Sequence, residues 1–247
     1  MQLILLRHGE SQWNLENRFT GWKDVELTPT GREEASFAGN QLLKFNIDIN
    51  SIHTSLLKRA TQTTDIVADI IGFSKDNIKY DWRLNERHYG ALQGLNKSET
   101  AAKYGEEQVH IWRRSYDTLP PLLSEDDVRY IELKNQFKDI ESSILKGESL
   151  KNVITRLGPF WNDYNNIIQE KDGNHLIIAH SNSLRAIIKI LDSLSSDEII
   201  SVNIPTGVPL VYKFDLHNKV IEKKYLIDKD ILQKKQKIIE NQGREKK

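Results

Sequence analysis

Two short aliphatic runs, each followed at once by polar residues that include a histidine, most constrain the fold of this chain. Residues 3–6 are Leu-Ile-Leu-Leu and precede Arg7 and His8, while residues 176–179 are Leu-Ile-Ile-Ala and precede His180. Such runs suit strands that are covered on both faces, as in a parallel sheet between helices. Ligands of such sheets collect beyond the carboxyl ends of the strands. We therefore expect both histidines at the rim of one crevice, although a strand and a polar turn would also explain the first run alone.

Strand and helix patterns alternate between and beside these runs. Thr28 and Pro29 have the residue types of a helix cap and a first turn, and apolar residues from Ala35 to Phe45 recur at helical spacing and should face the sheet. Further strands are expected over 51–55 and 210–214, the latter as the last central strand, and helices over 57–71, 97–104, 106–116, 150–168 with a kink at Pro159, and 184–194 with Ser183 as candidate cap. This alternation predicts an α/β fold.

Composition restricts the compartment and the partners. The 247 residues permit one large domain or two small ones, and we expect one. Thirty-five Lys and Arg balance 35 Asp and Glu, so no net field should attract nucleic acid or a membrane. The absence of cysteine excludes disulfides and thiolate metal sites. With no cationic, apolar leader and no run of transmembrane length, a cytoplasmic protein is expected.

Two segments stand apart within the single domain expected over 1–247. Residues 122–147 are charged and lack a strong period, and we interpret them as a surface insertion of helix and loop. Residues 229–247 carry seven basic and three acidic residues and form a basic tail, a type of segment that is usually just solvated.

Candidate binding groups lie in non-periodic segments. The loop from Ser11 to Asp24 is dense in amide, hydroxyl and aromatic groups, and residues 82–94 combine glycines with acidic and basic side chains. Arg59 falls in the first turns of a predicted helix, where backbone N–H groups favour anions. Arg113 and Arg114 are adjacent, so both could reach one ligand only from a helix end or turn. Solvated arginines and ordinary charged loops are the alternative for each segment alone.

These residue types suit phosphoryl transfer, which needs a nucleophile, a proton carrier and donors that hold the phosphoryl oxygens. His8 is the candidate nucleophile, and His180, if protonated, could donate to the transferring oxygens beside Arg7 and Arg59. Glu86 is the candidate proton carrier. No metal is obviously required, and the usual nucleotide-loop and helical zinc-protease motifs are missing. A metal site with two histidines stays conceivable, but neighbouring arginines would discourage it.

The chain resembles the cofactor-dependent phosphoglycerate mutases of the histidine phosphatase superfamily. Residues 7–10, Arg-His-Gly-Glu, resemble the superfamily signature, and the longer segments 7–14, 19–22, 84–97 and 203–212 resemble the mutase branch. The resemblance covers nearly the whole chain, is weakest over 122–147, and extends to Asn-Gln-Gly at 241–243. It implies a three-layer α/β/α sandwich with a mixed, mainly parallel sheet.

The resemblance also implies a reaction. His8 would be phosphorylated by 2,3-bisphosphoglycerate and would pass the group between the 2- and 3-hydroxyls of glycerate, interconverting 2- and 3-phosphoglycerate in glycolysis and gluconeogenesis. Glu86 would donate and accept the proton, and His180 would stabilise the moving phosphoryl group beside Arg7 and Arg59. The basic tail would help to close the site, no metal would take part, and homodimers or homotetramers would be usual. The implied substrate-binding residues are Arg7, His8, Gly9, Glu10, Ser11, Gln12, Trp13, Asn14, Thr20, Gly21, Arg59, Glu86, Arg87, His88, Tyr89, Lys97, Arg113, Arg114, Ser181 and Asn182.

One position departs from the family pattern. The second motif of the family is His-Gly-Asn, whereas residues 180–182 read His-Ser-Asn. If the backbone there needs a positive φ, Ser181 costs on the order of 1 to 2 kcal/mol, and its side chain could intrude on the phosphate. The expectation is retained but reduced activity.

Two alternatives to a mutase remain open from the sequence. A phosphatase on the same scaffold would let water attack phosphorylated His8. A non-catalytic metabolite-binding or partner-binding relative would bind its ligand but be impaired at Ser181.

Overall fold

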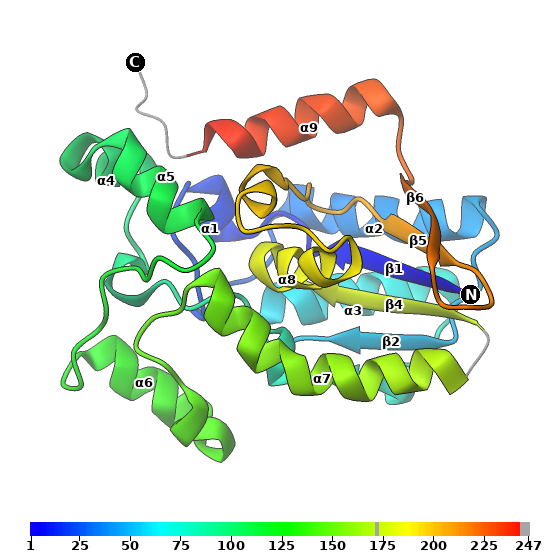
Figure 1. The fold of residues 1–247 in the computed structure, drawn as a ribbon, viewed down its shortest axis with the longest axis horizontal. Coiled ribbons are helices and arrows are strands. Elements are labelled where there is room, and N and C mark those ends of the chain that lie inside the picture. The colour runs from blue at the N-terminus through cyan, green and yellow to red at the C-terminus, as the bar shows by residue number, and fades with distance from the viewer. Residues whose placement is uncertain (171–172, 243–247) are drawn as a thin grey trace.

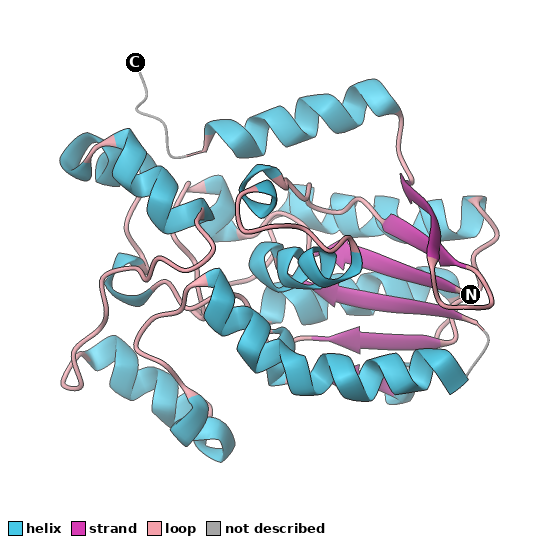
Figure 2. Ribbon diagram, viewed as in Figure 1, coloured by secondary structure: helices cyan, strands magenta, loops and turns pink. Residues whose placement is uncertain are grey.

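A six-stranded sheet forms the centre of the computed structural model, which describes residues 1–170 and 173–242. The strands are β1 (Gln2–Arg7), β2 (Ser51–Thr54), β3 (Ile78–Tyr80), β4 (Asn174–Ala179), β5 (Leu210–Phe214) and β6 (Val220–Tyr225), in the order β3-β2-β4-β1-β5-β6. The first four strands of that order run parallel, and β5 pairs antiparallel with both β1 and β6 (Figure 2). The predicted mixed, mainly parallel sheet is confirmed.

Helices cover both faces of this sheet. α2 (Pro29–Lys44) and α3 (Lys58–Ile71) pack on one face, and α7 (Leu150–Glu170) and α8 (Ser181–Leu191) pack on the other (Figure 1). Because side chains alternate along a strand, Leu3 and Leu5 of β1 join the core beneath α7 and α8, whereas Ile4 and Leu6 join the core beneath α2 and α3. The aliphatic run at 3–6 is therefore buried throughout, and the predicted three-layer arrangement is confirmed.

The remaining helices lie beyond the carboxyl ends of the parallel strands or along one side of the domain. They are α1 (Gln12–Leu15), α4 (Lys97–Tyr104), α5 (Glu106–Arg114), α6 (Val128–Gln136) and α9 (Lys229–Asn241), with short 3-10 helices at Lys75–Asn77, Trp82–Leu84, Gly90–Leu92, Lys138–Ser143 and Glu198–Ser201. Among the described residues, no helix is long and apolar enough to cross a membrane.

Helix and loop do occupy 122–147, as predicted, but part of this segment is buried. Leu133 and Phe137 pack in one apolar cluster with Trp22 and Leu57, so α6 is joined to the loop that precedes α2. The predicted basic tail begins as α9, which extends above α2 in Figure 1 with its C-terminal end toward α1 and α5. Residues 243–247, the end of that tail, lie outside the described residues. Residue 243 is also the last residue of the segment 241–243 that resembles the family's ending.

Some local predictions are wrong. Helix α8 begins at Ser181 with His180 as N-cap; Ser183 is inside the helix, where its hydroxyl accepts the His180 N–H at 3.1 Å. Phe45 is 45% exposed because α2 ends just before it. The predicted helix over 150–168 is confirmed as α7, which continues through Pro159, and the side chains of its residues 165–170 are not described.

Two edge strands were not predicted. β3 has only three residues, which is too short for a visible alternation. β6 exposes most of its side chains, so no apolar face marks it. β5 is the last central strand, as predicted, and β6 forms the edge beside it.

Candidate active site

The sheet register brings the two histidines together. β1 and β4 are neighbouring parallel strands in which Arg7 pairs with Ala179, so His8 and His180 both follow at the same edge of the sheet. Their rings lie 4.9 Å apart between centroids, at an interplanar angle of 60°. The predicted pairing of the two strand ends is confirmed.

Hydrogen bonds determine which nitrogen of His8 can react. Nδ1 lies 2.7 Å from the carbonyl oxygen of Gly9, and since a carbonyl only accepts, Nδ1 carries the proton. Nε2 is therefore the nitrogen that carries the lone pair, and it accepts a hydrogen bond from Nε of Arg59 at 3.3 Å. Arg59 is held in turn by donating to the carbonyls of Gly21 at 2.8 Å and Lys23 at 3.0 Å. The site thus presents an oriented imidazole nitrogen beside a fixed guanidinium group.

Burial and positive charge keep both imidazoles neutral. The pKa of His8 is held well below its ordinary value by burial first and then by Arg59 and Arg7. The pKa of His180 is held well below its ordinary value by burial, Arg59 and His8. A neutral His8 suits nucleophilic attack. The same causes favour a neutral His180, so protonation of this ring would require an added negative charge beside it.

Glu86 is held at the start of α8. Its Oε1 accepts hydrogen bonds from the backbone N–H groups of Arg87 at 2.7 Å and Asn182 at 3.1 Å, and from the Asn182 side-chain amide at 3.0 Å. Its carbonyl oxygen accepts from Nε1 of Trp22 and from Arg156. A carboxylate fixed in this way within the same pocket as His8 can exchange a proton with a bound hydroxyl.

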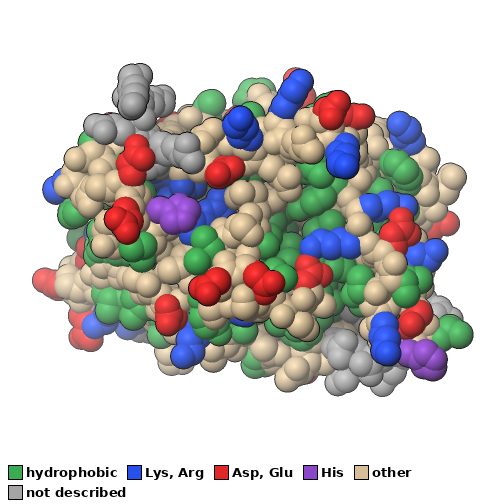
Figure 3. Space-filling model, turned by 45° about the horizontal axis from the view of Figure 1, so that its top comes forward, with side chains coloured by type: hydrophobic (Ala, Val, Ile, Leu, Met, Phe, Trp, Pro, Cys, Tyr) green, Lys and Arg blue, Asp and Glu red, His purple; other side chains and the backbone are tan. Residues whose placement is uncertain are grey.

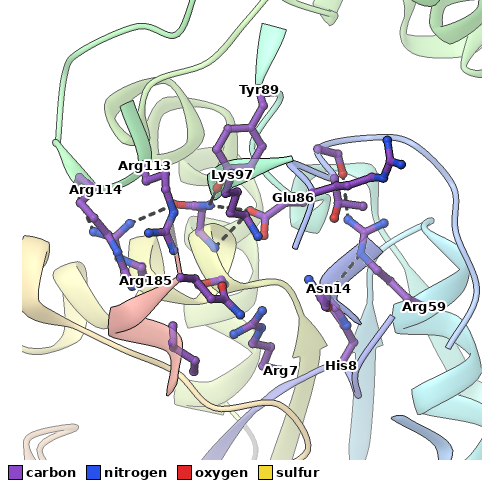
Figure 4. A pocket seen from close by; sticks show the side chains of 17 residues that line it. Arg7, His8, Asn14, Arg59, Glu86, Tyr89, Lys97, Arg113, Arg114 and Arg185 are labelled. Carbon is purple, nitrogen blue, oxygen red and sulfur yellow. Dashed lines mark hydrogen bonds between the residues drawn. The ribbon is translucent and has the colours of Figure 1, made fainter. Parts of the chain in front are cut away.

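Cationic side chains dominate the pocket that contains His8. Figure 4 shows Arg7, Arg59, Lys97, Arg113, Arg114 and Arg185 converging on it from different elements, with Glu86 as the labelled carboxylate. The complete lining is Arg7, His8, Asn14, Arg18, Thr20, Gly21, Arg59, Glu86, Tyr89, Lys97, Arg113, Arg114, Ser181, Asn182, Arg185, Ile239 and Gln242. Seven cationic groups against one carboxylate favour a ligand with several negative charges.

The arginines retain free donor capacity although they are buried. Arg7 donates through Nη1 to the carbonyl of Ile204 at 2.9 Å, and its Nε has no partner within residues 1–170 and 173–242. Arg113 and Arg114 end α5, the position at which adjacent arginines were predicted to reach one ligand. Outside the pocket the two signs are interspersed on the face shown in Figure 3, in keeping with a net charge of zero. The anion-binding character is therefore local.

Seven of the predicted substrate-binding residues do not line this pocket. Gly9, Ser11, Arg87 and His88 are buried beside it; Glu10 lines an adjoining groove under α9, Trp13 a separate one, and Gln12 is exposed. Gly9 has a structural reason for its size, since an added Cβ would lie 2.0 Å from the Gly31 carbonyl oxygen. His88 accepts the Gly90 N–H through Nδ1 and donates its own N–H to Glu148.

Four lining residues were not predicted. Arg18 belongs to the loop from Ser11 to Asp24, in which other ligand contacts were predicted. Ile239 and Gln242 come from the end of α9, so the tail reaches the site as the family resemblance implied. Arg185 follows Asn182 by three residues on α8, and its signal in the sequence was a charge within an apolar helical run.

The prediction of backbone strain at Ser181 is wrong. Ser181 is the first residue of α8 and has helical backbone, so no positive φ is required of it. Ser181 does line the pocket, which keeps its side chain near any bound anion.

The side chains of the site include groups that can take part in phosphoryl transfer. Among residues 1–170 and 173–242, no cluster of three or more His, Cys, Asp or Glu could hold a metal ion. The arrangement instead offers a neutral nucleophilic nitrogen, a fixed carboxylate and many guanidinium donors. That set can accept and return a phosphoryl group.

Solved structures share this fold. Mycobacterial glucosyl-3-phosphoglycerate phosphatase superposes with a TM-score of 0.70 at 22% identity, covering 92% of this chain and 98% of that chain. The alpha-ribazole phosphatase from Shigella flexneri gives 0.62 at 20% identity, with 89% and 93% coverage.

Curated relatives are similar over the whole length. The 2,3-bisphosphoglycerate-dependent phosphoglycerate mutase of Lachnoclostridium phytofermentans is 48% identical, over 99% of this chain and 98% of that protein. The protein of the same name from Treponema denticola is 49% identical over the full length of both. The model of the histidine phosphatase superfamily (branch 1) matches residues 3–225. With its paired strand-end histidines and full-length relatives, the chain belongs to the histidine phosphatase superfamily.

Proposed function

We propose that this chain interconverts 2-phosphoglycerate and 3-phosphoglycerate through a phosphohistidine on His8 that is primed by 2,3-bisphosphoglycerate. The observation that carries the proposal is the Nε2 of a neutral His8 at a pocket with seven cationic groups and one carboxylate. The full-length relatives carry the name of that activity.

Each half of the reaction uses groups that are already in place. Nε2 of His8 attacks the phosphorus of a bound phosphate ester, the bond from phosphorus to the ester oxygen breaks, and Glu86 in its acid form gives that oxygen a proton. In the reverse half, Glu86 removes a proton from the other glycerate hydroxyl, which attacks the phosphorus and releases His8. Arg7 and Arg59 neutralise the moving phosphoryl group.

The remaining cations suit the rest of the ligand. Lys97, Arg113 and Arg114 lie on α4 and α5, away from the strand ends, where they can hold a carboxylate or a second phosphate. A bisphosphorylated primer fits such a charge balance better than a neutral ester would. We further propose a cytoplasmic enzyme that acts as a homodimer or homotetramer, which sedimentation of the purified protein would test.

A coupled assay tests the function. Purified protein supplied with 3-phosphoglycerate should form 2-phosphoglycerate, and the rate should rise when 2,3-bisphosphoglycerate is added. Mass spectrometry should detect an acid-labile phosphoryl group on the wild type but not on His8→Ala. Release of inorganic phosphate without isomerisation would instead identify a phosphatase, and tight ligand binding without phosphoenzyme would identify a non-catalytic relative.

A further inference from the structure

Arg185 is a buried cation to which the proposed reaction assigns no role. It is 1% exposed on α8, among Leu184, Ala186 and Ile187 of the apolar core. A guanidinium in such a place is costly unless its donors are satisfied. Its Nη2 donates to the carbonyls of Ile199 at 2.8 Å and Arg114 at 3.1 Å, and its Nη1 donates to Oδ1 of Asn182 at 3.0 Å, whereas its Nε has no partner among the described residues. Of these contacts, the one with Asn182 connects Arg185 to the proposed proton carrier, because Asn182 also donates to Glu86.

The contact determines how the Asn182 carboxamide is turned. A guanidinium has no acceptor, so only the oxygen of the amide can face Arg185. The amide nitrogen must then face the opposite way, where Nδ2 donates to Glu86 Oε1 at 3.0 Å and to the Tyr89 hydroxyl at 3.2 Å. A flipped amide would place its oxygen against the Glu86 carboxylate and its NH₂ group against the guanidinium, so both contacts would become repulsive.

The amide in turn determines the position of the Glu86 carboxylate. Within the described part of the chain, the three hydrogen bonds to that carboxylate all end on Oε1, and Asn182 supplies two of them. The other oxygen, Oε2, is thereby left for a ligand hydroxyl. Tyr89 accepts from Asn182, so its own proton is also free to be donated.

We infer that Arg185 is a positioning residue, which locks the orientation of the Asn182 carboxamide and through it aims Glu86 for proton transfer. This inference rests on the proposed function, because it assigns Glu86 the proton. The lock acts on the chemical step more than on binding of the ligand.

Steady-state kinetics of Arg185→Met and Arg185→Lys test the lock. Arg185→Met should lower kcat by about 10- to 100-fold, the effect of losing one charge-assisted hydrogen bond, while KM rises by a smaller factor because one of the seven pocket cations is lost. Arg185→Lys, which keeps a cationic donor but loses the fork, should recover part of the rate. The matched control is Lys189→Met, a cation on the same helix whose ammonium donates to the Leu194 carbonyl; its rate should equal that of the wild type.

A double-mutant cycle separates positioning from simple support of the fold. If Arg185 acts through Asn182, Arg185→Met should lower kcat by less than about twofold in an Asn182→Ala background. An equal loss in both backgrounds, or a loss confined to KM, would overturn the inference. If Arg185→Met does not fold, the same cycle with Arg185→Lys decides the question.

Failure of the proposed function would appear separately. A wild type that releases phosphate but does not isomerise phosphoglycerate would refute the mutase assignment. The cycle would then be measured on the phosphatase rate, since the leaving oxygen still needs the proton of Glu86. Additive losses there would overturn the role of Arg185 as well.

Discussion

The hydroxyl oxygen of Ser55 lies 2.7 Å from Nε2 of His180, and both side chains are fully buried. The same hydroxyl accepts the Leu57 N–H at 3.3 Å, so it is held between the start of α3 and the ring of His180. Ser55 follows β2, so the strand next to β4 fixes the ring of the second histidine. The geometry around phosphoryl transfer thus depends on a third strand end as well as on β1 and β4.

Ser55→Ala should therefore lower kcat by about tenfold, the value of one buried hydrogen bond that orients a catalytic ring. The measurement is the isomerisation rate at saturating substrate. Thr54→Val is the matched control, because the Thr54 hydroxyl donates to the Ile178 carbonyl and not to His180. Equal losses in the two variants would mean that only packing had been disturbed.

The lowered pKa of Lys97 predicts that the protein takes up protons when it binds an anionic ligand. Burial holds this pKa well below its ordinary value, and Arg113, Arg7 and Arg114 lower it further. An anionic ligand would reverse these effects and raise the pKa, so the enzyme should take up protons on binding at mildly alkaline pH. Calorimetry of 2,3-bisphosphoglycerate binding in two buffers of different ionisation enthalpy measures that uptake.

Lys97→Met should reduce the uptake, whereas Lys103→Met, which removes an exposed lysine of the same helix, should leave it unchanged. Binding enthalpies of the wild type that do not depend on the buffer would contradict this prediction.

A buried ion pair between Arg156 and Glu148 holds the backbone on both sides of Glu86. Nε of Arg156 lies 2.8 Å from Oε1 of Glu148, with side chains only 6% and 3% exposed. Arg156 also donates to the Arg83 carbonyl at 2.7 Å, and Glu148 accepts the His88 N–H at 2.8 Å. Glu148→Gln would leave the guanidinium buried without its counter-charge, so the free energy of unfolding should fall by about 3 kcal/mol.

Denaturant titration of Glu148→Gln measures that loss. Glu125→Gln removes the carboxylate of an exposed ion pair with Lys146 nearby in the sequence and should leave the transition unchanged. If the two variants are equally stable, the buried pair contributes nothing to the support of this segment.

Ser181→Gly should change little, because Ser181 already has the helical backbone of a first turn. Glycine at this position would gain freedom in the unfolded chain, so we expect a loss of at most about 1 kcal/mol in stability and a change in kcat below about threefold. The melting temperature and the isomerisation rate check both expectations. A large gain in rate would show that the serine side chain, and not the backbone, limits the reaction.

The parts of the site that could be predicted are those determined by residues that are adjacent in the sequence. Four consecutive aliphatic residues before a histidine identify a buried strand and its polar end, and two such ends in neighbouring strands must meet. Adjacent arginines near a helix end carry similar local information, and Arg113 and Arg114 do end α5.

The parts that could not be predicted depend on contacts across the fold. In the sequence, Arg185 is only a charged residue within an apolar helix. Its contact with Asn182, which in turn donates to Glu86, is visible only in the folded structure. Ile239 reaches the pocket only because α9 folds back over the strand ends, which no local pattern encodes. The strain assigned to Ser181 was wrong because one residue type does not reveal a φ angle.

Acid should destabilise the protein through its buried imidazoles, of which His53 and His88 lie outside the active-site pocket. Burial lowers the pKa of both His53 and His88 to about 4 from an ordinary 6.5. Lys79 and His175 act in the same direction on His53, whereas Asp81 opposes them; for His88, Glu148 raises the pKa and Arg129 and Arg156 lower it. Each imidazole is therefore neutral in the folded protein at a pH where the unfolded chain would bind a proton.

The sign of the effect follows from this difference. As the pH falls from about 6.5 to about 4, the unfolded state gains protons that the folded state refuses, so each group should remove up to about 3 kcal/mol of stability across that window. Nothing is lost from these groups above 6.5, where both states are neutral. His53→Gln should make the pH dependence of urea unfolding shallower, because it removes one of the buried imidazoles that titrate in this window. His217→Gln, at an exposed position in the β5–β6 connection, should leave the dependence as in the wild type; equal slopes for all three proteins would rule out His53 as a source of acid sensitivity.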